Sequence, residues 1–420
     1  MNYCAASAPA KPRSTPIPYS IYRPARPNNC SVVKAMPKKS LRMHRCASRM
    51  RIDYLSYDYR PHPVALLIGE LFALHNHEQF EVYVLSIGPD DASPTRQHFR
   101  DSCDHFIDLA SLSLADAASA IHDLEIQVLI DLTGYTTGGR AEILAMRPAP
   151  VQVNWLGYPV TSGTPFIDYI VADRAIIPPE LEHYYSEAVV RLPDCYQLND
   201  RRRPLTERPP SRAACGLPEQ GMVFACFNHT HKITPEMFDI WMRLLHQTPG
   251  SVLWLLESNA LAATNLRREA QARGIDSTRV VFAPRAPLAK HLARYRLADL
   301  ALDTFPYTSH TTTSDTLWAG CPLLTCMGET FASRVAGSLL HAVGLAELVT
   351  QDFTEYEALA LNLASDTARL HELQHKLAKP AAAPLFDAPA RVRALERAYQ
   401  QMLALWIADR PTGGFDVQTG

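Results

Sequence analysis

The chain is 420 residues long, which is enough for two or three domains with substantial cores. Its apolar content of 47% and charged content of 20% are ordinary for a globular protein, and no apolar run approaches the ~20 residues of a membrane span. Nine scattered cysteines without a CxxC pair favour reduced thiols in the cytoplasm over a secreted disulfide framework, and no zinc-type ligand spacing predicts a metal site.

The net charge of −2 hides a basic N-terminal segment, because residues 1–50 carry many Lys, Arg and Pro residues and no Asp or Glu. We predict that this segment is disordered. Binding to RNA or anionic lipid, a transit-peptide role, or no function at all remain open for it. The remainder of the chain is acidic and is not expected to bind nucleic acid.

Residues 51–205 alternate strand-like and helix-like patterns and are predicted to form an N-terminal, doubly wound parallel lobe. Strands are expected at 51–57, 80–86, 106–109, 127–132, 151–155 and 166–173, and helices at 64–74 and 114–122.

Three polar loops follow strands of this lobe, at 58–62, 134–140 and 156–163. Ligands of open α/β sheets bind at the carboxyl ends of the strands, so these loops are candidate site elements. His62 lies between two prolines and near Asp58. It either serves the site as a proton acceptor or hydrogen-bond donor, or it is a helix-start histidine bonded to the backbone.

The polar, Pro-rich stretch 201–210 is predicted to link the first lobe to a second Rossmann-like lobe at 206–390. Strands of the second lobe are expected at 221–227, 251–256, 279–283, 299–303 and 322–326, with helices from Pro235, at 262–273 and at 352–365. A helix at 391–407 is expected to pack back on the first lobe, and the tail 408–420 to be disordered.

Lys232 lies just before the helix that starts at Pro235, for which Thr234 is the predicted N-cap. A lysine there either reaches a phosphate as a point charge or is a solvated loop residue. Trp241 falls on the apolar face of this helix and is predicted to be core rather than a stacking platform.

The central stretch is 303–315, a loop rich in hydroxyls between a short strand and a helix. A helix N-terminus offers free N–H groups to phosphate, and Asp315, about one turn in, is placed to accept ribose hydroxyls. The alternative is that Thr313 or Ser314 is an ordinary N-cap and His310 a surface turn residue.

The runs HTTTSDTLWAG at 310–320 and GETFASR at 328–334, with FNHTHKITP at 227–235, resemble the catalytic half of the protein O-GlcNAc transferase (SPINDLY-like) family. The resemblance extends over roughly 51–400. It implies a GT-B fold of two Rossmann-like lobes facing a cleft. It also implies an inverting, metal-independent transfer of N-acetylglucosamine from UDP-GlcNAc to Ser or Thr hydroxyls of an unidentified protein acceptor.

The resemblance also implies roles for individual residues. The residues implied for catalysis are Asp58, His62 and Lys232, of which Lys232 neutralises the UDP diphosphate. The residues implied for UDP-sugar binding are His229, Ala286, His291, Arg294, His310, Thr311, Thr312 and Asp315. The cleft-loop residues are Tyr135, Arg140, Leu156, Gly157, Tyr158 and Pro159.

The chain departs from the family pattern at Leu288, where a lysine is usual, at Val160, where glycine is usual, and in having no 34-residue repeat. Three alternatives therefore stay open. The first is a related enzyme with another donor, such as the GDP-fucose of plant SPINDLY-type members. The second is a truncated or degenerate homologue that only binds nucleotide or partners. The third is a metabolic two-lobed transferase or epimerase with a small-molecule acceptor.

Overall fold

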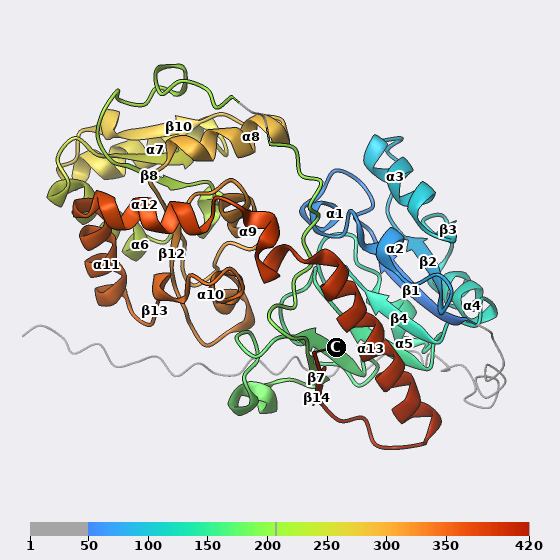
Figure 1. Ribbon diagram of the computed structural model, residues 1–420. Helices are drawn as coiled ribbons and strands as arrows, with labels where there is room; N and C mark the ends of the chain where they lie inside the picture. The colour runs from blue at the N-terminus through green and yellow to red at the C-terminus, as the bar shows by residue number, and fades with distance from the viewer. Residues whose placement is uncertain (1–48, 206–207, 420) are drawn as a thin grey trace, which may run out of the picture. The chain divides into compact units, whose positions relative to one another are not determined.

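The computed structural model describes residues 49–205 and 208–419, all of which belong to one structural unit. The predictions for the basic segment therefore lie outside the described residues, apart from Arg49 and Met50. Figure 1 shows two sheets, each with helices around it. Among the described residues, no helix has the length and apolarity needed to cross a membrane.

The first sheet contains eight parallel strands in the order β14-β7-β6-β5-β4-β1-β2-β3. Parallel pairing with crossover helices is what the alternating sequence pattern predicts. Its strands are β1 (Met50–Ser56), β2 (Phe80–Ser86), β3 (His105–Asp108), β4 (Val128–Asp131), β5 (Val151–Asn154), β6 (Tyr169–Ala172), β7 (Ala188–Arg191) and β14 (Phe415–Asp416).

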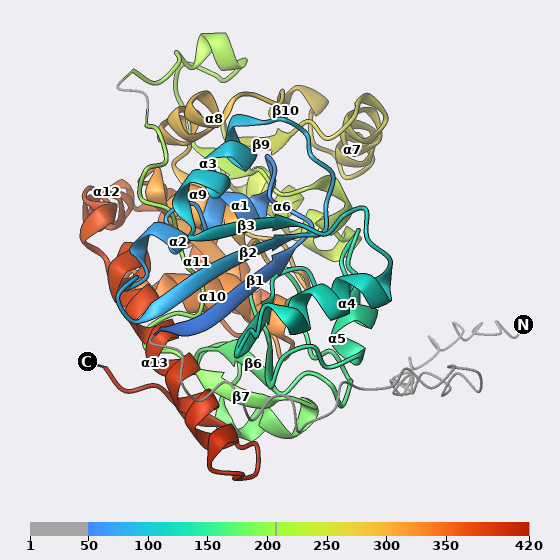
Figure 2. The same cartoon turned by 90° about the vertical axis from the view of Figure 1, so that its right-hand side faces the viewer.

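The helices of the first lobe are short and lie on both faces of the sheet. They are α1 (Pro63–Leu67), α2 (Leu71–Leu74), α3 (Pro94–Ser102), α4 (Leu114–Asp123), α5 (Ala141–Ala145) and the 3₁₀ helix η2 (Pro179–Tyr184). Successive strand residues point to opposite faces: Ile52 and Tyr54 enter the larger apolar core, whereas Leu55 packs with Ile121 of α4 in a second core. Figure 2 shows α4 and α5 beside β1, β2 and β3.

The single helix predicted at 64–74 is wrong, because the chain forms two helices separated at Gly69. A Cβ atom on Gly69 would come within 2.0 Å of the Asp200 carboxylate, so the chain packs closely here against the segment that leaves the lobe. This contact is made by a residue 131 positions away and leaves no periodic signal in the local sequence.

The second sheet contains six parallel strands in the order β10-β9-β8-β11-β12-β13. They are β8 (Val223–Cys226), β9 (Val252–Leu256), β10 (Val280–Ala283), β11 (Leu300–Leu302), β12 (Leu323–Cys326) and β13 (Val349–Thr350). The helices are α6 (Pro235–Gln247), α7 (Ala260–Ala272), α8 (Leu288–Arg294), α9 (Thr311–Trp318), α10 (Phe331–Ala342), α11 (Phe353–Ser365) and α12 (Thr367–Lys376). The short 3₁₀ helices are η3 (Ala213–Cys215), η4 (Thr230–Lys232), η5 (Ser277–Arg279), η6 (Tyr295–Leu297), η7 (Ala346–Leu348), η8 (Pro380–Ala382) and η9 (Pro384–Phe386).

Helix α6 follows the sequence prediction closely. The Thr234 hydroxyl accepts a hydrogen bond from Met237 N, as an N-cap does, and Pro235 occupies the first helical position. Trp241 is 1% exposed and its indole N–H donates to the Tyr356 hydroxyl, which confirms it as a core residue.

The last long helix, α13 (Ala388–Ile407), returns to the first lobe and packs on α2 and β5 (Figures 1 and 2). Glu396 of α13 accepts a hydrogen bond from Asn76 N and pairs with the buried His75 at 2.9 Å. The prediction of a disordered tail is wrong for the described part, because β14 pairs in parallel with β7. Arg174 and Arg191 both form ion pairs with Asp416 of β14.

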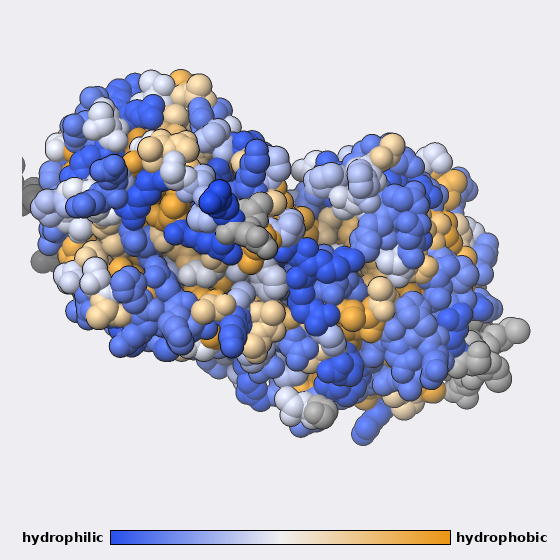
Figure 3. Space-filling model, turned by 45° about the horizontal axis from the view of Figure 1, so that its top comes forward, coloured by the Kyte–Doolittle hydropathy of each residue, from blue (hydrophilic) through white to orange (hydrophobic). Residues whose placement is uncertain are grey.

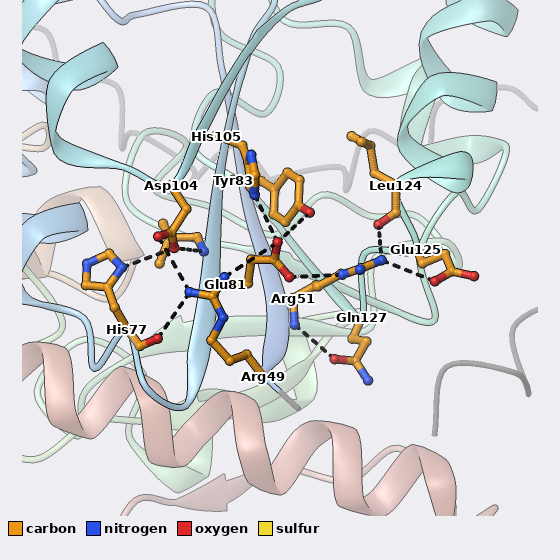
Figure 4. A network of polar contacts seen from close by, with 11 residues as sticks. Arg49, Arg51, His77, Glu81, Tyr83, Asp104, His105, Leu124, Glu125 and Gln127 are labelled. Carbon is orange, nitrogen blue, oxygen red and sulfur yellow. Dashed lines mark hydrogen bonds and ion pairs between the residues drawn. The ribbon is translucent and has the colours of Figure 1, made fainter. Parts of the chain in front are cut away.

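A network of charged side chains closes the amino-terminal edge of β1, β2 and β3 (Figure 4). Glu81 accepts hydrogen bonds from Arg51 and Tyr83 and pairs with His105, and Arg49 pairs with Asp104. In a parallel sheet this edge is opposite the carboxyl ends of the strands, so the network holds the sheet together away from the candidate site.

Candidate functional site

Asp303, at the carboxyl end of β11, organises the loop that leads to α9. Its buried carboxylate accepts hydrogen bonds from Thr304 N, Ser309 N and Oγ, and Thr325 Oγ1. Asn228 Nδ2, at the end of β8, donates to the same carboxylate at 3.1 Å. Five donors on one carboxylate fix the path of residues 304–309, and the loop therefore presents α9 in one orientation.

Helix α9 begins at Thr311 with His310 as its N-cap residue, and the His310 side chain makes no capping hydrogen bond. The alternative in which Thr313 or Ser314 is the N-cap is therefore wrong. Thr313 instead donates to the Ser309 carbonyl, and Ser314 accepts from Gln197 Nε2 at 2.6 Å. The backbone N–H groups of Thr311 and Thr312 lie in the first turn, where no carbonyl of the helix can accept them. They are therefore available to bind an anion.

Lys232 lies beside this helix start, although it comes from η4 in another loop. Its Nζ donates to the Thr308 carbonyl at 2.9 Å and lies 4.0 Å from the centroid of the Tyr307 ring. Burial lowers the pKa of Lys232 to about 8, although the Asp303 carboxylate opposes this shift. The solvated-loop alternative is wrong, because the side chain is held at the loop that precedes α9.

Two histidines of the predicted site are neutral at physiological pH, because burial lowers the pKa of His310 and of His291 to about 3. His310 Nε2 is 3.3 Å from the Ala332 carbonyl and must carry the proton in that contact. His291 Nδ1 accepts from an Arg294 guanidinium N–H, which places the imidazole proton on Nε2. His291 is therefore a neutral hydrogen-bond donor, suited to a carbonyl oxygen of a ligand.

A cavity of about 740 Å³ opens where the two lobes meet, and the space-filling view shows the surface indented between them (Figure 3). Its volume is typical of small-ligand sites. Four of its lining residues are predicted site residues: His62, Ala286, His291 and Asp315. Leu288, where the family usually has a lysine, lines it as well.

Asp315 lines the cavity and also accepts a hydrogen bond from Arg203, in the segment that connects the two lobes. Its Oδ1 accepts from Arg203 Nη1 at 2.6 Å, and its Oδ2 has no hydrogen-bond partner among the described residues. Burial raises the pKa of Asp315 to about 6, although Arg203 opposes the shift. One carboxylate oxygen thus holds the segment between the lobes, and the other is free for a ligand hydroxyl.

The cleft loops of the first lobe interlock through close glycine contacts. A Cβ on Gly134 would meet the Tyr158 side chain at 2.4 Å, and a Cβ on Gly157 would meet the Leu132 carbonyl at 1.8 Å. Tyr135 and Tyr158 form an edge-to-face pair with centroids 5.4 Å apart, and Tyr135 is half exposed. Leu156 has φ of 77°, a strained value for a residue with a side chain. Pro159 follows Tyr158 in this loop.

His62 is the N-cap residue of α1, and its Nδ1 accepts from Val64 N at 3.3 Å. The backbone-bonded alternative for this histidine is thus present in the structure, but His62 also lines the cavity. Asp58 Oδ2 lies 3.4 Å from Nδ1, and burial lowers the pKa of His62. With Nδ1 as an acceptor, the neutral ring carries its proton on Nε2.

Other predicted residues do not line the cavity. Arg140 donates to the carbonyls of Leu109 and Leu112 and so braces the neighbouring loop. His229 contacts Arg285, which does line the cavity. Arg294 donates to the Pro284 carbonyl and orients His291. Lys232, His310 and the hydroxyls of Thr311 and Thr312 belong to the adjoining start of α9.

The sequence reasoning did not assign site roles to Asp303, Tyr307 or Arg203. Asp303 carried one usable signal, a carboxylate at the end of a short apolar strand. Arg203 carried none, because it lies in a Pro-rich stretch that was predicted to be a linker and its partner is 112 residues away.

The model of glycosyl transferase family 41 matches residues 29–208 and 208–395. The "Probable UDP-N-acetylglucosamine--peptide N-acetylglucosaminyltransferase SEC" of Arabidopsis thaliana is 39% identical over 376 residues, which are 88% of this chain and 38% of that protein. The "Probable UDP-N-acetylglucosamine--peptide N-acetylglucosaminyltransferase SPINDLY" of Petunia hybrida is 34% identical over 365 residues, 84% of this chain and 38% of that protein. The chain therefore spans about two fifths of the length of these curated relatives.

Among solved structures, a mutant of Thermobaculum terrenum O-GlcNAc transferase superposes with a TM-score of 0.79 at 30% identity. The match covers 86% of this chain and 69% of that chain. It confirms the predicted GT-B arrangement of two Rossmann-like lobes. Together with the family model over most of the sequence, it shows that this chain belongs to glycosyl transferase family 41.

Proposed function

We propose that this chain is the catalytic region of an inverting glycosyltransferase that moves N-acetylglucosamine from UDP-GlcNAc to Ser or Thr hydroxyls of a protein. The observation that carries the proposal is the position of Lys232, whose ammonium group is held at the start of α9 by the Thr308 carbonyl and the Tyr307 ring. A cation and free helix N–H groups at one point form an anion site suited to a diphosphate.

The adjoining cavity supports a nucleoside as the other part of the donor. Asp315 Oδ2 is free to accept ribose hydroxyls, and the Nε2–H of His291 is suited to a carbonyl oxygen of uracil. Ala286 and Leu288 line the same cavity and offer an apolar surface to the base. The usual lysine of the family is Leu288 here, so base recognition would depend on packing and on His291.

In the proposed reaction, the acceptor oxygen forms a bond to the anomeric carbon as the bond from that carbon to the diphosphate breaks. The bonding electron pair leaves with UDP, and Lys232, the N–H groups of Thr311 and Thr312 and their hydroxyls stabilise its new charge. The chain supplies its own cation for this step, so we propose that the transfer needs no metal. The proton of the acceptor hydroxyl leaves to a base that we do not assign.

His62 and Asp58 would act on the acceptor side. The Nε2–H of His62 would orient the acceptor or the sugar as a hydrogen-bond donor, and the Asp58 carboxylate beside Nδ1 would favour the protonated form of the ring. The exposed Tyr135 and the cleft loop at 156–159 would line the path by which an acceptor peptide approaches.

The test is transfer of radiolabelled GlcNAc from UDP-GlcNAc to a panel of Ser/Thr peptides, together with thermal unfolding in UDP, GDP and neither. A ligand that binds only the folded state raises its melting temperature. We expect UDP to raise the melting temperature and GDP to leave it unchanged, and we expect transfer to depend on Lys232.

The alternatives give different results in the same experiment. A shift with GDP alone would identify another donor. Brisk UDP-GlcNAc turnover with no peptide product would indicate a small-molecule acceptor. A shift with UDP but no turnover of any kind would indicate a nucleotide-binding homologue.

A further inference from the structure

A second cavity, of about 610 Å³, lies away from the donor site, against the amino-terminal half of α13. It is formed where four segments meet: residues 193–201 leaving the first lobe, η8 and η9 at the end of the second lobe, α13, and Thr419 after β14. None of the residues that we assign to the donor or acceptor site lines it.

The cavity is lined by four arginines, of which three form no ion pair with a described acidic residue. Arg201 is paired with Glu70 at 3.1 Å. Arg391, Arg393 and Arg397 also line the cavity, and no ion pair to any of them exists among the described residues. Arg393 and Arg397 are one helical turn apart on α13, so their side chains share a face.

Arg391 is the strongest indication that a ligand is expected here. It is 3% exposed, and one of its guanidinium N–H groups donates to the Pro193 carbonyl. Its buried Nε has no hydrogen-bond partner, and neither does the buried Nε of Arg397. The buried Asp173 carboxylate compensates part of the Arg391 charge, since Arg391 opposes the rise in pKa that burial gives Asp173. The unpartnered Nε–H groups still lack acceptors, which a bound anion would supply.

Two carboxylates at the cavity limit what can bind. Asp387 caps α13 by accepting from Ala390 N, and Asp194 is exposed. Neither forms an ion pair within the described part of the chain. Their repulsion of an anion opposes the attraction of the guanidinium groups, so binding relies on direct hydrogen bonds from the arginines.

We propose that this cavity is a second anion site, which binds a small ligand carrying two or more phosphate groups. The planar guanidinium group donates two parallel hydrogen bonds to a phosphate, and three such groups around one cavity of this size match a di- or triphosphate. The bound ligand would contact both segments that connect the lobes, the stretch 193–201 and α13. The inference does not depend on the proposed transferase activity.

The experiment is calorimetric titration of the full chain with sodium tripolyphosphate in the presence of saturating UDP, which blocks the donor site. The test variant is Arg393→Gln/Arg397→Gln, which removes two charges from one exposed or half-buried face and keeps Arg391 in place. The control is Arg243→Gln. Arg243 is an exposed arginine of α6 that pairs with Glu357 and does not line the cavity. We expect one equivalent of tripolyphosphate to bind, at least about tenfold more weakly in the double variant and unchanged in the control.

Vesicles that contain phosphatidylinositol bisphosphate form a second arm, because a lipid headgroup carries the same phosphate chemistry. Binding of tripolyphosphate would show that a free phosphorylated ligand suffices, and binding confined to vesicles would identify a lipid headgroup as the source. Either result supports the site if the double variant loses that binding. Binding by neither, or binding that the double variant retains in full, would overturn the proposal.

A failure of this site is distinguishable from a failure of the proposed function. The UDP-dependent rise in melting temperature should persist in Arg393→Gln/Arg397→Gln, which also shows that the variant folds. Tripolyphosphate binding under saturating UDP should persist in Lys232→Ala if the second site is real, whatever that variant does to transfer.

Discussion

The ammonium nitrogen of Lys232 lies 4.0 Å from the centroid of the Tyr307 ring, and the same ring stacks with the His310 imidazole at a centroid distance of 4.9 Å. The three side chains come from the ends of β8 and β11. Tyr307 therefore ties the cation of one loop to the helix start of the other. Asp303, which receives hydrogen bonds from both loops, holds them at this spacing.

Replacing Lys232 should affect turnover far more than donor binding. In the proposed reaction the ammonium group meets charge that develops on the leaving diphosphate, so Lys232→Ala should lower turnover by roughly 10²–10³, as the loss of one charge-stabilising donor does in other enzymes. The dissociation constant for UDP-GlcNAc should rise much less. Transfer kinetics and calorimetry measure the two quantities, and Lys290→Ala, at an exposed lysine of α8, is the control. Equal turnover by Lys232→Ala and the control would remove Lys232 from the mechanism.

The ring of Tyr307, rather than its hydroxyl, should position Lys232. A cation over an aromatic face gains about 1–2 kcal/mol when partly desolvated, so Tyr307→Leu should lower turnover roughly tenfold. Tyr307→Phe keeps the ring and should stay close to the parent. A Phe variant as impaired as the Leu variant would show that the hydroxyl, not the ring, matters.

The pH profile of kcat/KM should be bell-shaped, with limbs near pH 6 and pH 8. Asp315, with a pKa of about 6, is protonated below that pH and loses an acceptor for ribose and the charge that faces Arg203. Lys232, with a pKa of about 8, loses its positive charge above that pH. UDP-GlcNAc is the substrate for this measurement, and the profile reports the free enzyme.

Asp315→Asn is the matched variant for the acidic limb. It keeps the size of the side chain and removes its titration, so activity, although lower, should no longer fall below pH 6. The basic limb should remain. An unchanged acidic limb in this variant would assign that limb to another group.

Asp53 should destabilise the folded chain as the pH rises. It is fully buried on β1, both carboxylate oxygens lack a hydrogen-bond partner, and burial together with the nearby Asp131 raises its pKa. Because the folded-state pKa lies above the unfolded value of about 3.9, the unfolded chain releases this proton first. The parent therefore loses stability as the pH rises above about 4, by up to about 1.4 kcal/mol per pH unit from this one group.

Asp53→Asn removes this proton release. Its advantage over the parent in urea unfolding should be absent near pH 4 and should grow toward pH 7. Asp123→Asn, at an exposed carboxylate that ends α4, controls for a general change in net charge. A difference between Asp53→Asn and the parent that stays constant with pH would show that Asp53 does not titrate as inferred.

Much of the structure of the proposed donor side was predictable, because its parts are local in sequence. A strand, a hydroxyl-rich loop and a helix start follow one another between 300 and 318, and the cap and proline at Thr234 and Pro235 fix the helix after Lys232. The resemblance added residue roles to these segments. The acceptor side was less predictable, since His62 caps a helix and lines the cavity at once.

Sequence periodicity also failed where distant segments meet. The break between α1 and α2 follows from the approach of Asp200 to Gly69. Strand β14 pairs with the edge of β7, and its Asp416 forms ion pairs with Arg191 of β7 and with Arg174, which follows β6. Neither feature has a local cause that a pattern of apolar residues would reveal.

By itself, the sequence determined the class of the fold, its two lobes and the loops that carry the proposed donor site, because hydrophobic periodicity, caps and turns act over a few residues. The tertiary structure decided which groups face one another: Lys232 with Tyr307, Asp315 with Arg203, and three arginines that form no ion pair among the described residues around one cavity. Such pairs depend on how strands are ordered in a sheet and how lobes pack, and these are set by the burial of surfaces far apart in the chain.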